Sequence, residues 1–200
     1  NHFWKMHTEG IVPDVTTYLC ILKACGNIGC LNSGENIHFN IFRDGLLQKD
    51  SLLSTALVDM YVKCGSLTKA HEVFNQFTCR DVITWTALIT GYAQFGKDEI
   101  VVDLFNKMIQ EGLQPDAPMF TVVLNACSHT GLVDDGQVYF KVMSANCGIM
   151  PTVEHHTCII DLLGRAGQLE CALAVTQTIC TNHDSILWHT VLDACRKSGN

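Results

Sequence analysis

The 200-residue sequence lacks several features that mark common functional classes. No apolar run approaches the roughly 18 residues that a membrane-spanning helix needs, so no such helix and no membrane partner are predicted. No phosphate-binding loop, nucleophile elbow or pair of catalytic carboxylates is found. Basic residues are few, because 13 Lys and Arg stand against 20 Asp and Glu, for a formal net charge of −7. This balance counts against nucleic-acid binding, for which a basic stripe is the usual sign, and we expect the chain to bind weakly alone.

Metal sites and disulfide frameworks are poorly supported, although the chain has 11 cysteines. No C-x-x-C pair occurs. His7 and Glu9 form an H-x-E sequence, but no P-C-x-x-C follows it as in zinc deaminases, and His155–His156 has no third ligand nearby. We therefore expect reduced thiols, no metal, no cofactor and no catalysis in this chain, which we predict is not an enzyme.

Glycine, in contrast, recurs at nearly regular intervals. Six glycines stand 31 to 36 residues apart, each after a helical-looking stretch: Gly29, Gly65, Gly96, Gly131, Gly167 and Gly199. Such a period is the signature of stacked repeats. Cys25, Cys127 and Cys195 share one slot of the repeat, which predicts buried core residues.

Each repeat has the pattern of a helical hairpin. Around Gly96 the apolar residues follow an i, i+3, i+4, i+7 spacing on both sides: Trp85, Leu88, Ile89 and Tyr92, then Val101, Leu104, Phe105 and Met108. Glycine suits the left-handed cap between two helices, and Gly112 to Pro115 ends the second helix. One hairpin cannot bury both apolar faces alone. We therefore predict an all-α, right-handed α-α superhelical solenoid of helical hairpins.

Two families of hairpin repeat fit this length, and the eighth slot of the repeat separates them. Tetratricopeptide repeats carry glycine or another small residue there. This chain carries large aliphatic residues instead: Leu22, Val58, Ile89, Leu124, Ile160 and Leu192. The tetratricopeptide interpretation is therefore disfavoured.

The motifs resemble those of plant pentatricopeptide repeat proteins of the PLS class, E type. The segment 56–65 resembles the S motif, and Thr84–Ile89 with Gly112–Asp116 resembles the P motif. Leu22–Cys25 and Leu124–His129 resemble L motifs, with Gly34 and Gly136 where the other types carry alanine. The resemblance implies this division: 1–14, tail of a truncated P-type repeat; 15–50, L; 51–81, S; 82–116, P; 117–152, L; 153–184, final S; 185–200, start of an E extension. We expect the chain to be a fragment of a longer protein.

The resemblance implies that each repeat recognises one base of single-stranded RNA through its fifth and last residues. The resulting base-recognition residues are Thr55 with Asp81, Thr86 with Asp116, and Thr157 with Asp184. By resemblance, Thr with Asp favours guanine, whose ring N–H and amino group donate to acceptors. Leu19 with Asp50 offers no polar group at the fifth slot, and Thr121 with Thr152 belongs to an L motif that is not interpretable.

Purely structural interpretations of the same residues remain open. An Asp directly before a helix is a favourable N-cap, and both roles can coexist in one carboxylate. The second-slot residues Leu52, Ile83 and Pro118 flank the bases by resemblance, yet a partly exposed apolar residue needs no special explanation.

The resemblance implies a site-recognition factor for C-to-U RNA editing in a mitochondrion or chloroplast. Its expected partner is single-stranded organelle RNA, with proteins of the editing complex or a deaminase in trans as further candidates. Two alternatives stay open. One is a protein-interaction solenoid without an RNA role, and the other is the recognition part of a full-length deaminase.

Overall fold

The computed structural model describes residues 6, 9–47, 51–77 and 80–179, and within these ranges all regular structure is α-helical. The helices are α2 (Val15–Ile28), α3 (Leu31–Arg43), α4 (Ser51–Lys63), α5 (Leu67–Gln76), α6 (Val82–Gln94), α7 (Asp98–Gln110), α8 (Ala117–Thr130), α9 (Val133–Ala145), α10 (Val153–Arg165) and α11 (Leu169–Ile179). The predicted all-α class is confirmed. None of these helices is long and apolar enough to cross a bilayer.

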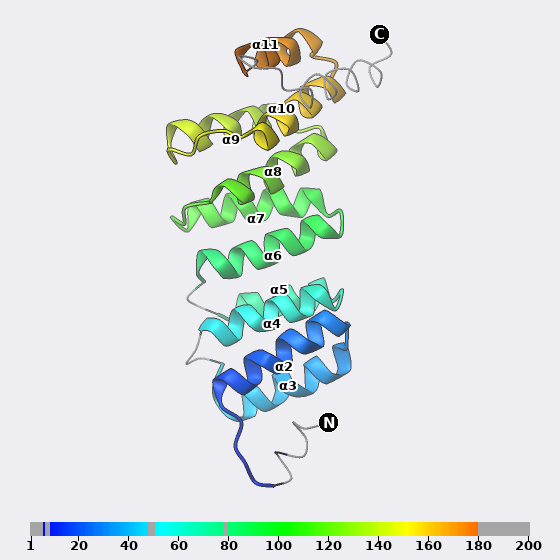
Figure 1. Ribbon diagram of the computed structural model, residues 1–200, viewed down its shortest axis with the longest axis vertical. Coiled ribbons are helices and arrows are strands. Elements are labelled where there is room, and N and C mark those ends of the chain that lie inside the picture. The colour runs from blue at the N-terminus through cyan, green and yellow to red at the C-terminus, as the bar shows by residue number, and fades with distance from the viewer. Residues whose placement is uncertain (1–5, 7–8, 48–50, 78–79, 180–200) are drawn as a thin grey trace. The chain divides into compact units, whose positions relative to one another are not determined.

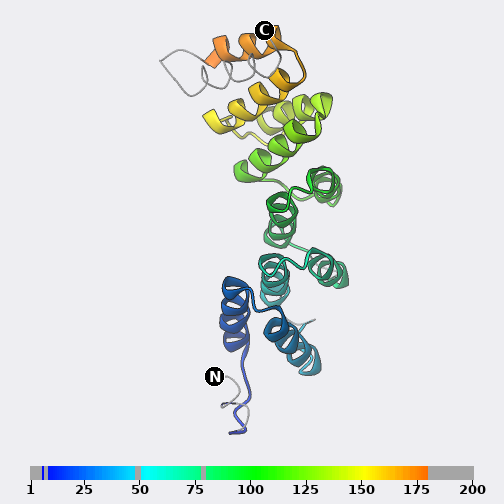
Figure 2. The same cartoon turned by 90° about the vertical axis from the view of Figure 1, so that its right-hand side faces the viewer.

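The chain divides into two compact units, Asn1–Tyr92 and Ala93–Asn200. In the first unit, α2 with α3 and α4 with α5 form two hairpins, and α2 also packs on α4 (Figure 1). Figure 2 shows the two helices of each hairpin side by side. The part of α6 in this unit packs on α5, where the rings of Phe74 and Trp85 meet edge to face with centroids 4.6 Å apart.

The second unit repeats this arrangement. Helices α8 and α9 form one hairpin, α10 and α11 form another, and α10 packs on α8 (Figure 1). Helix α7 packs against α8, and Phe105 of α7 contacts the rings of Phe120 and Tyr139. In each unit the first helices of the two hairpins, α2 and α4 or α8 and α10, therefore pack on each other as well as on their own partners, as a stacked hairpin array requires.

The first helix of a hairpin ends at a glycine with left-handed backbone conformation, as α2 and α8 show. Gly29 after α2 has φ 72°, and Gly131 after α8 has φ 74°. Their backbone N–H groups donate to carbonyls in the last turn of the helix, so these otherwise unsatisfied groups are paired. The predicted glycine cap is confirmed at both turns.

The core follows the predicted apolar slots. Leu88 and Ile89 are both fully buried. The other eighth-slot residues that the structure describes are also fully buried: Leu22, Val58, Leu124 and Ile160. Cys25 and Cys127 lie in the core as predicted, whereas Cys195 and Leu192 lie outside the described residues. Burial raises the pKa of the Cys127 thiol to about 12, so this thiol is an apolar filler.

The glycines of the L-like units have a packing explanation. A Cβ added at Gly34 of α3 would overlap the thioether of Met60 in α4. One added at Gly136 of α9 would overlap Leu162 of α10. These second helices therefore approach the following first helix too closely for alanine without movement of a neighbour.

Candidate nucleic-acid interface

Asp81 stands directly before α6 and caps it. Its Oδ1 accepts a hydrogen bond from the Thr84 backbone N–H at 2.8 Å and another from the Thr84 hydroxyl at 2.6 Å. The first bond satisfies one of the donors that a helix N-terminus leaves open. Both bonds fall on Oδ1, so the cap does not use Oδ2.

Thr55 is the half-buried fifth residue of α4, and the structure connects it to Asp81. Its Oγ1 is 2.7 Å from the Thr84 Oγ1 and 3.1 Å from the Ser51 carbonyl oxygen. The predicted pair Thr55 and Asp81 is thus joined through Thr84, a residue that sequence analysis did not select. The available signal was the Asp-x-x-Thr spacing, which recurs at Asp14 and Thr17 with bonds of 2.8 and 2.6 Å.

The other predicted base-recognition residues that the structure describes make their hydrogen bonds to the helix that each lies in or caps. The hydroxyls of Thr86 and Thr157 donate to carbonyls one turn back in their own helices, at 2.7 and 2.8 Å. Asp116 caps α8 by accepting the Met119 N–H at 3.0 Å. Thr86 belongs to the first unit and Asp116 to the second. Asp184, the partner of Thr157, lies outside the described residues.

The two pairs that were not expected to recognise a base differ from these. Leu19 is half-buried, and its partner Asp50 lies outside the described residues. Thr152 replaces Asp before α10, and its neighbour His155 completes the cap. The Thr152 backbone N–H donates to His155 Nδ1 at 3.0 Å, and His155 Nε2 lies 2.8 Å from the Ala117 carbonyl.

His155 is therefore a structural residue that sequence analysis considered only as a metal ligand. It is 1% exposed, and its ring links the start of α10 to the start of α8. Because Nδ1 accepts from a backbone N–H, the proton is on Nε2, which donates to the carbonyl. Among the described residues, no group of three His, Cys, Asp or Glu side chains is arranged to hold a metal ion.

The second-slot residues lie at the surface. The exposed fractions of Leu52 and Ile83 are 58% and 64%, and Pro118 is also exposed. Each is the second residue of a first helix, beside the turn that carries the capping residue. Each of the three therefore presents an apolar side chain to solvent at the start of a first helix.

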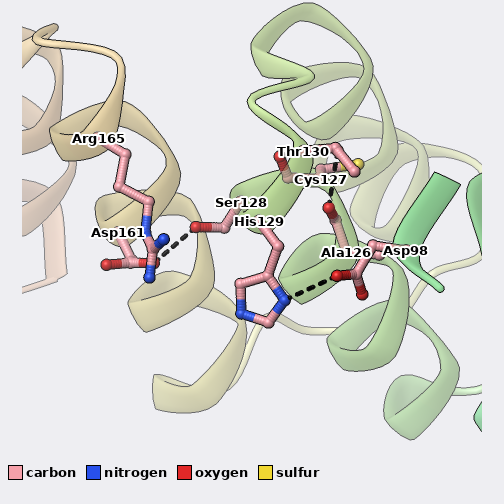
Figure 3. A network of polar contacts seen from close by, with 8 residues as sticks. All are labelled: Asp98, Ala126, Cys127, Ser128, His129, Thr130, Asp161 and Arg165. Atoms are coloured by element: carbon pink, nitrogen blue, oxygen red, sulfur yellow. Dashed lines mark hydrogen bonds and ion pairs between the residues drawn. The ribbon is translucent and has the colours of Figure 1, made fainter. Parts of the chain in front are cut away.

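A second polar network lies at the C-terminal end of α8, away from Asp116 (Figure 3). Asp161 Oδ2 of α10 accepts from the Ser128 hydroxyl at 2.6 Å and from Arg165 Nε at 2.7 Å. His129 Nδ1 lies 3.2 Å from Asp98 Oδ2 at the start of α7. These contacts tie α8 to α10 and to α7, so they stabilise the stack.

Family models identify the repeat. The model described as PPR repeat matches residues 54–82 and 118–147, and the PPR repeat family model matches residues 80–129. Segments within residues 54–147 therefore match the pentatricopeptide repeat. Thr55, Asp81, Thr86 and Asp116 all lie within the matched segments.

Curated relatives come from Arabidopsis thaliana. A putative pentatricopeptide repeat-containing protein is 40% identical over 198 residues, covering 99% of this chain and 26% of the relative. A mitochondrial pentatricopeptide repeat-containing protein is 41% identical over 198 residues, covering 99% of this chain and 31% of the relative. The chloroplastic protein DOT4 is 40% identical over 184 residues, with 92% and 21% covered. The chain thus spans about a fifth to a third of the relatives' length.

Solved structures share the fold. The maize pentatricopeptide repeat protein PPR10 matches with a TM-score of 0.70 at 23% identity, covering 98% of this chain and 31% of PPR10. PPR10 in complex with an 18-nt psaJ RNA element matches with a TM-score of 0.66 at 21% identity, covering 96% and 27%. The pentatricopeptide domain of Arabidopsis protein-only RNase P 1, in complex with tRNA, matches with a TM-score of 0.69 at 12% identity. This match covers 88% of this chain and 95% of that domain. The helical-hairpin solenoid is therefore confirmed as the fold class.

Proposed function

We propose that this chain binds single-stranded RNA and recognises individual bases at the start of its first helices. The observation that carries the proposal is the connected pair of Thr55 and Asp81, with the exposed Ile83 beside it. The pair presents polar atoms for a base edge, and the apolar neighbour can contact a base face. The RNA complex of the structurally similar PPR10 supports a nucleic-acid role for this fold.

The chemistry of the pairs favours guanine. An ionised carboxylate only accepts hydrogen bonds, whereas the Watson–Crick edge of guanine presents a ring N–H beside an amino group. By the parallel polarity of the family, Thr55 with Asp81 recognises the base directly 5′ of the one recognised by Thr86 with Asp116. We therefore expect two adjacent guanines in the preferred RNA, with Thr157 and Asp184 recognising a further base.

The net charge of −7 limits how the chain can bind RNA. Without a basic excess, little of its affinity can come from phosphate neutralisation. Base contacts must then supply most of the binding energy, so the affinity should depend strongly on sequence and weakly on salt. We expect this chain to bind weakly alone and more tightly with additional repeats.

At a finer level, we propose that the protein is a site-recognition factor for C-to-U editing in a plant organelle. The L, S and P motifs and the E-like segment support this role, and relatives are named mitochondrial and chloroplastic. The guanine pair would then lie a few nucleotides upstream of the edited cytidine. The deaminase would lie on another chain or in a C-terminal domain of the same protein, and in the latter case the full-length protein would itself be the enzyme.

A protein-interaction solenoid is the second candidate, and two observations favour it. The charge is acidic, and Phe39 and Phe42 of α3 are 64% and 67% exposed. These side chains lie on a second helix, whereas the predicted base-recognition residues lie before and within first helices. The two functions therefore involve different surfaces and can be tested separately.

Competition binding tests the RNA proposal. Short single-stranded RNAs should contain two adjacent guanines, two adenines or two uracils in an otherwise constant sequence. We expect preference for the guanine RNA and a shallow dependence on salt, measured from about 50 to 200 mM. Phe39→Ser with Phe42→Ser serves as the matched control and should leave RNA binding unchanged. Equal binding of all three RNAs, or binding lost only in the control, would contradict the proposal.

A further inference from the structure

The hydroxyl of Thr84 lies between the two side chains proposed to recognise one base. Thr84 is 2% exposed, and its Oγ1 is 2.6 Å from Asp81 Oδ1 and 2.7 Å from Thr55 Oγ1. We propose that Thr84 is a positioning residue that fixes the direction of hydrogen bonding in this pair and thereby selects guanine over adenine. The inference rests on the proposed RNA-binding function.

Counting protons sets the direction of each bond. The carboxylate of Asp81 only accepts, so the single proton of the Thr84 hydroxyl is donated to Asp81. In the contact between Thr84 and Thr55, the donor must then be Thr55. The Ser51 carbonyl is the other acceptor near Thr55, but at 3.1 Å it is farther away than Thr84.

Thr55 therefore presents lone pairs, and no proton, to a ligand. With Asp81 it forms two acceptors side by side. Guanine matches them with its ring N–H and amino group. Adenine has an acceptor at its ring N1, which would face the Thr55 lone pair without a proton between them, and an unpaired polar contact of this kind is costly. The fixed direction of the bond thus excludes adenine.

Among the described residues, a hydroxyl that joins a cap to the preceding repeat is seen at Thr84, whereas at the start of α10 the third-slot residue His155 contacts the Ala117 carbonyl instead. In α6 and α10, Thr86 and Thr157 donate to their own helices at 2.7 and 2.8 Å, shorter than the 3.1 Å of Thr55. Thr121 of α8 is 3.4 Å from its own Ala117 carbonyl, but Thr55 is the described fifth-slot threonine for which a hydroxyl of the next repeat lies within hydrogen-bond distance. At the equivalent cap before α8, the third slot holds Met119, which has no hydroxyl.

The experiment removes one hydroxyl from the full natural protein. Thr84→Val keeps the side-chain shape and leaves the Thr55 proton only the longer contact with the Ser51 carbonyl at 3.1 Å, so the proton can turn toward a ligand. Thr84→Ser keeps the hydroxyl. Thr17→Val is the matched control, because Thr17 makes the same two bonds to Asp14 before α2. The measurement is competition between RNAs with guanine or adenine at the nucleotide assigned to Thr55 and Asp81, with melting temperatures recorded for every variant.

We expect Thr84→Val to reduce the guanine-over-adenine preference by about tenfold at that nucleotide and not at its 3′ neighbour. Thr84→Ser and Thr17→Val should keep the wild-type ratio. If Thr84→Val weakens all RNAs equally, Thr84 only supports the Asp81 cap and the inference is wrong. If Thr84→Val does not fold, Thr84→Ala is judged by the same ratio. A wild-type protein without guanine preference would instead overturn the proposed function on which the inference rests.

Discussion

The residues that cap the first helices of this protein include those proposed to recognise bases. At the four first helices whose capping residue is described, the third-slot residue contacts that capping residue: Thr17, Thr84, Met119 and His155 contact Asp14, Asp81, Asp116 and Thr152. At the three aspartate caps the contact falls on Oδ1, so Oδ2 takes no part in the cap. Capping and base recognition are therefore compatible, as the sequence left open.

Asp116 separates the two roles experimentally. Asn caps helices about as well as Asp, so Asp116→Asn should leave the free energy of unfolding nearly unchanged. Its amide presents a donor as well as an acceptor, so the preference at that nucleotide should move from guanine to adenine by about 1–3 kcal/mol. Competition binding and urea unfolding measure the two effects. Asp14→Asn is the control at a different cap, and a wild-type guanine-to-adenine ratio in Asp116→Asn would leave capping as the only role.

His156 should make stability depend on pH. Burial lowers its pKa below 6.5, the nearby His155 lowers it further, and the hydrogen bond to the Thr152 carbonyl partly offsets both. Between the folded and unfolded pKa values, the unfolded chain binds more protons, so stability rises with pH in that range. We expect the melting temperature to fall as pH drops from about 7.5 to 5.5.

His156→Phe tests this assignment. The ring of His156 meets Phe140 edge to face with centroids 5.2 Å apart, and phenylalanine keeps an aromatic ring there without a titrating group. The melting temperature of the variant should fall less over the acidic range than that of the wild type. Parallel curves for the two proteins would show that His156 does not contribute to the pH dependence.

Sequence reasoning could not predict Thr84 or His155 as connecting residues. Their roles depend on contacts between neighbouring helices. Thr84 contacts Thr55, 29 residues earlier in the sequence, and His155 contacts Ala117, 38 residues earlier. Apolar periodicity reports which face of a helix is buried, but it does not fix the distance between polar atoms on neighbouring helices. The Asp-x-x-Thr spacing could have indicated the bond between Thr84 and Asp81, but not the contact between Thr84 and Thr55.

At the scale of helices, the spacing of apolar residues and the glycine caps predicted the elements well. The predicted sequence of helix, glycine turn and helix agrees with α2 and α3 around Gly29 and with α8 and α9 around Gly131. Close helix approach was not predicted, because a glycine inside a helix has several possible causes. The division into L, S and P units stays a prediction.

Helix approach at Gly91 gives a prediction with an internal control. A Cβ at Gly91 of α6 would lie 2.6 Å from both γ carbons of Val62 in α4. Valine is stiff about χ1, so overpacking should cost about 1–3 kcal/mol, more than the roughly 1 kcal/mol that alanine gains in helix propensity. Gly34→Ala meets the flexible end of Met60 and should be nearly neutral. Urea unfolding of the two variants should show this order, and equal stability would contradict it.

At the scale of the whole molecule, a solenoid differs from a globular domain in how a local defect spreads. Each hairpin contacts its neighbours in the stack, so stability is approximately a sum of repeat and interface terms. The two compact units of this chain each contain such a stack. A core mutation should therefore weaken its own repeat and the adjacent ones.

Leu88→Ala tests this property. Leu88 is fully buried in α6, and its truncation should leave a cavity that costs about 2–5 kcal/mol. In native-state hydrogen exchange, we expect lost amide protection in α6 and in the hairpins next to it, and unchanged protection in α2 and α10. Leu173→Ala is the control, because Leu173 is 36% exposed and its truncation should change little. A uniform loss of protection in all helices would mean that the chain unfolds as one cooperative block, and the nearest-neighbour description of this solenoid would then be wrong.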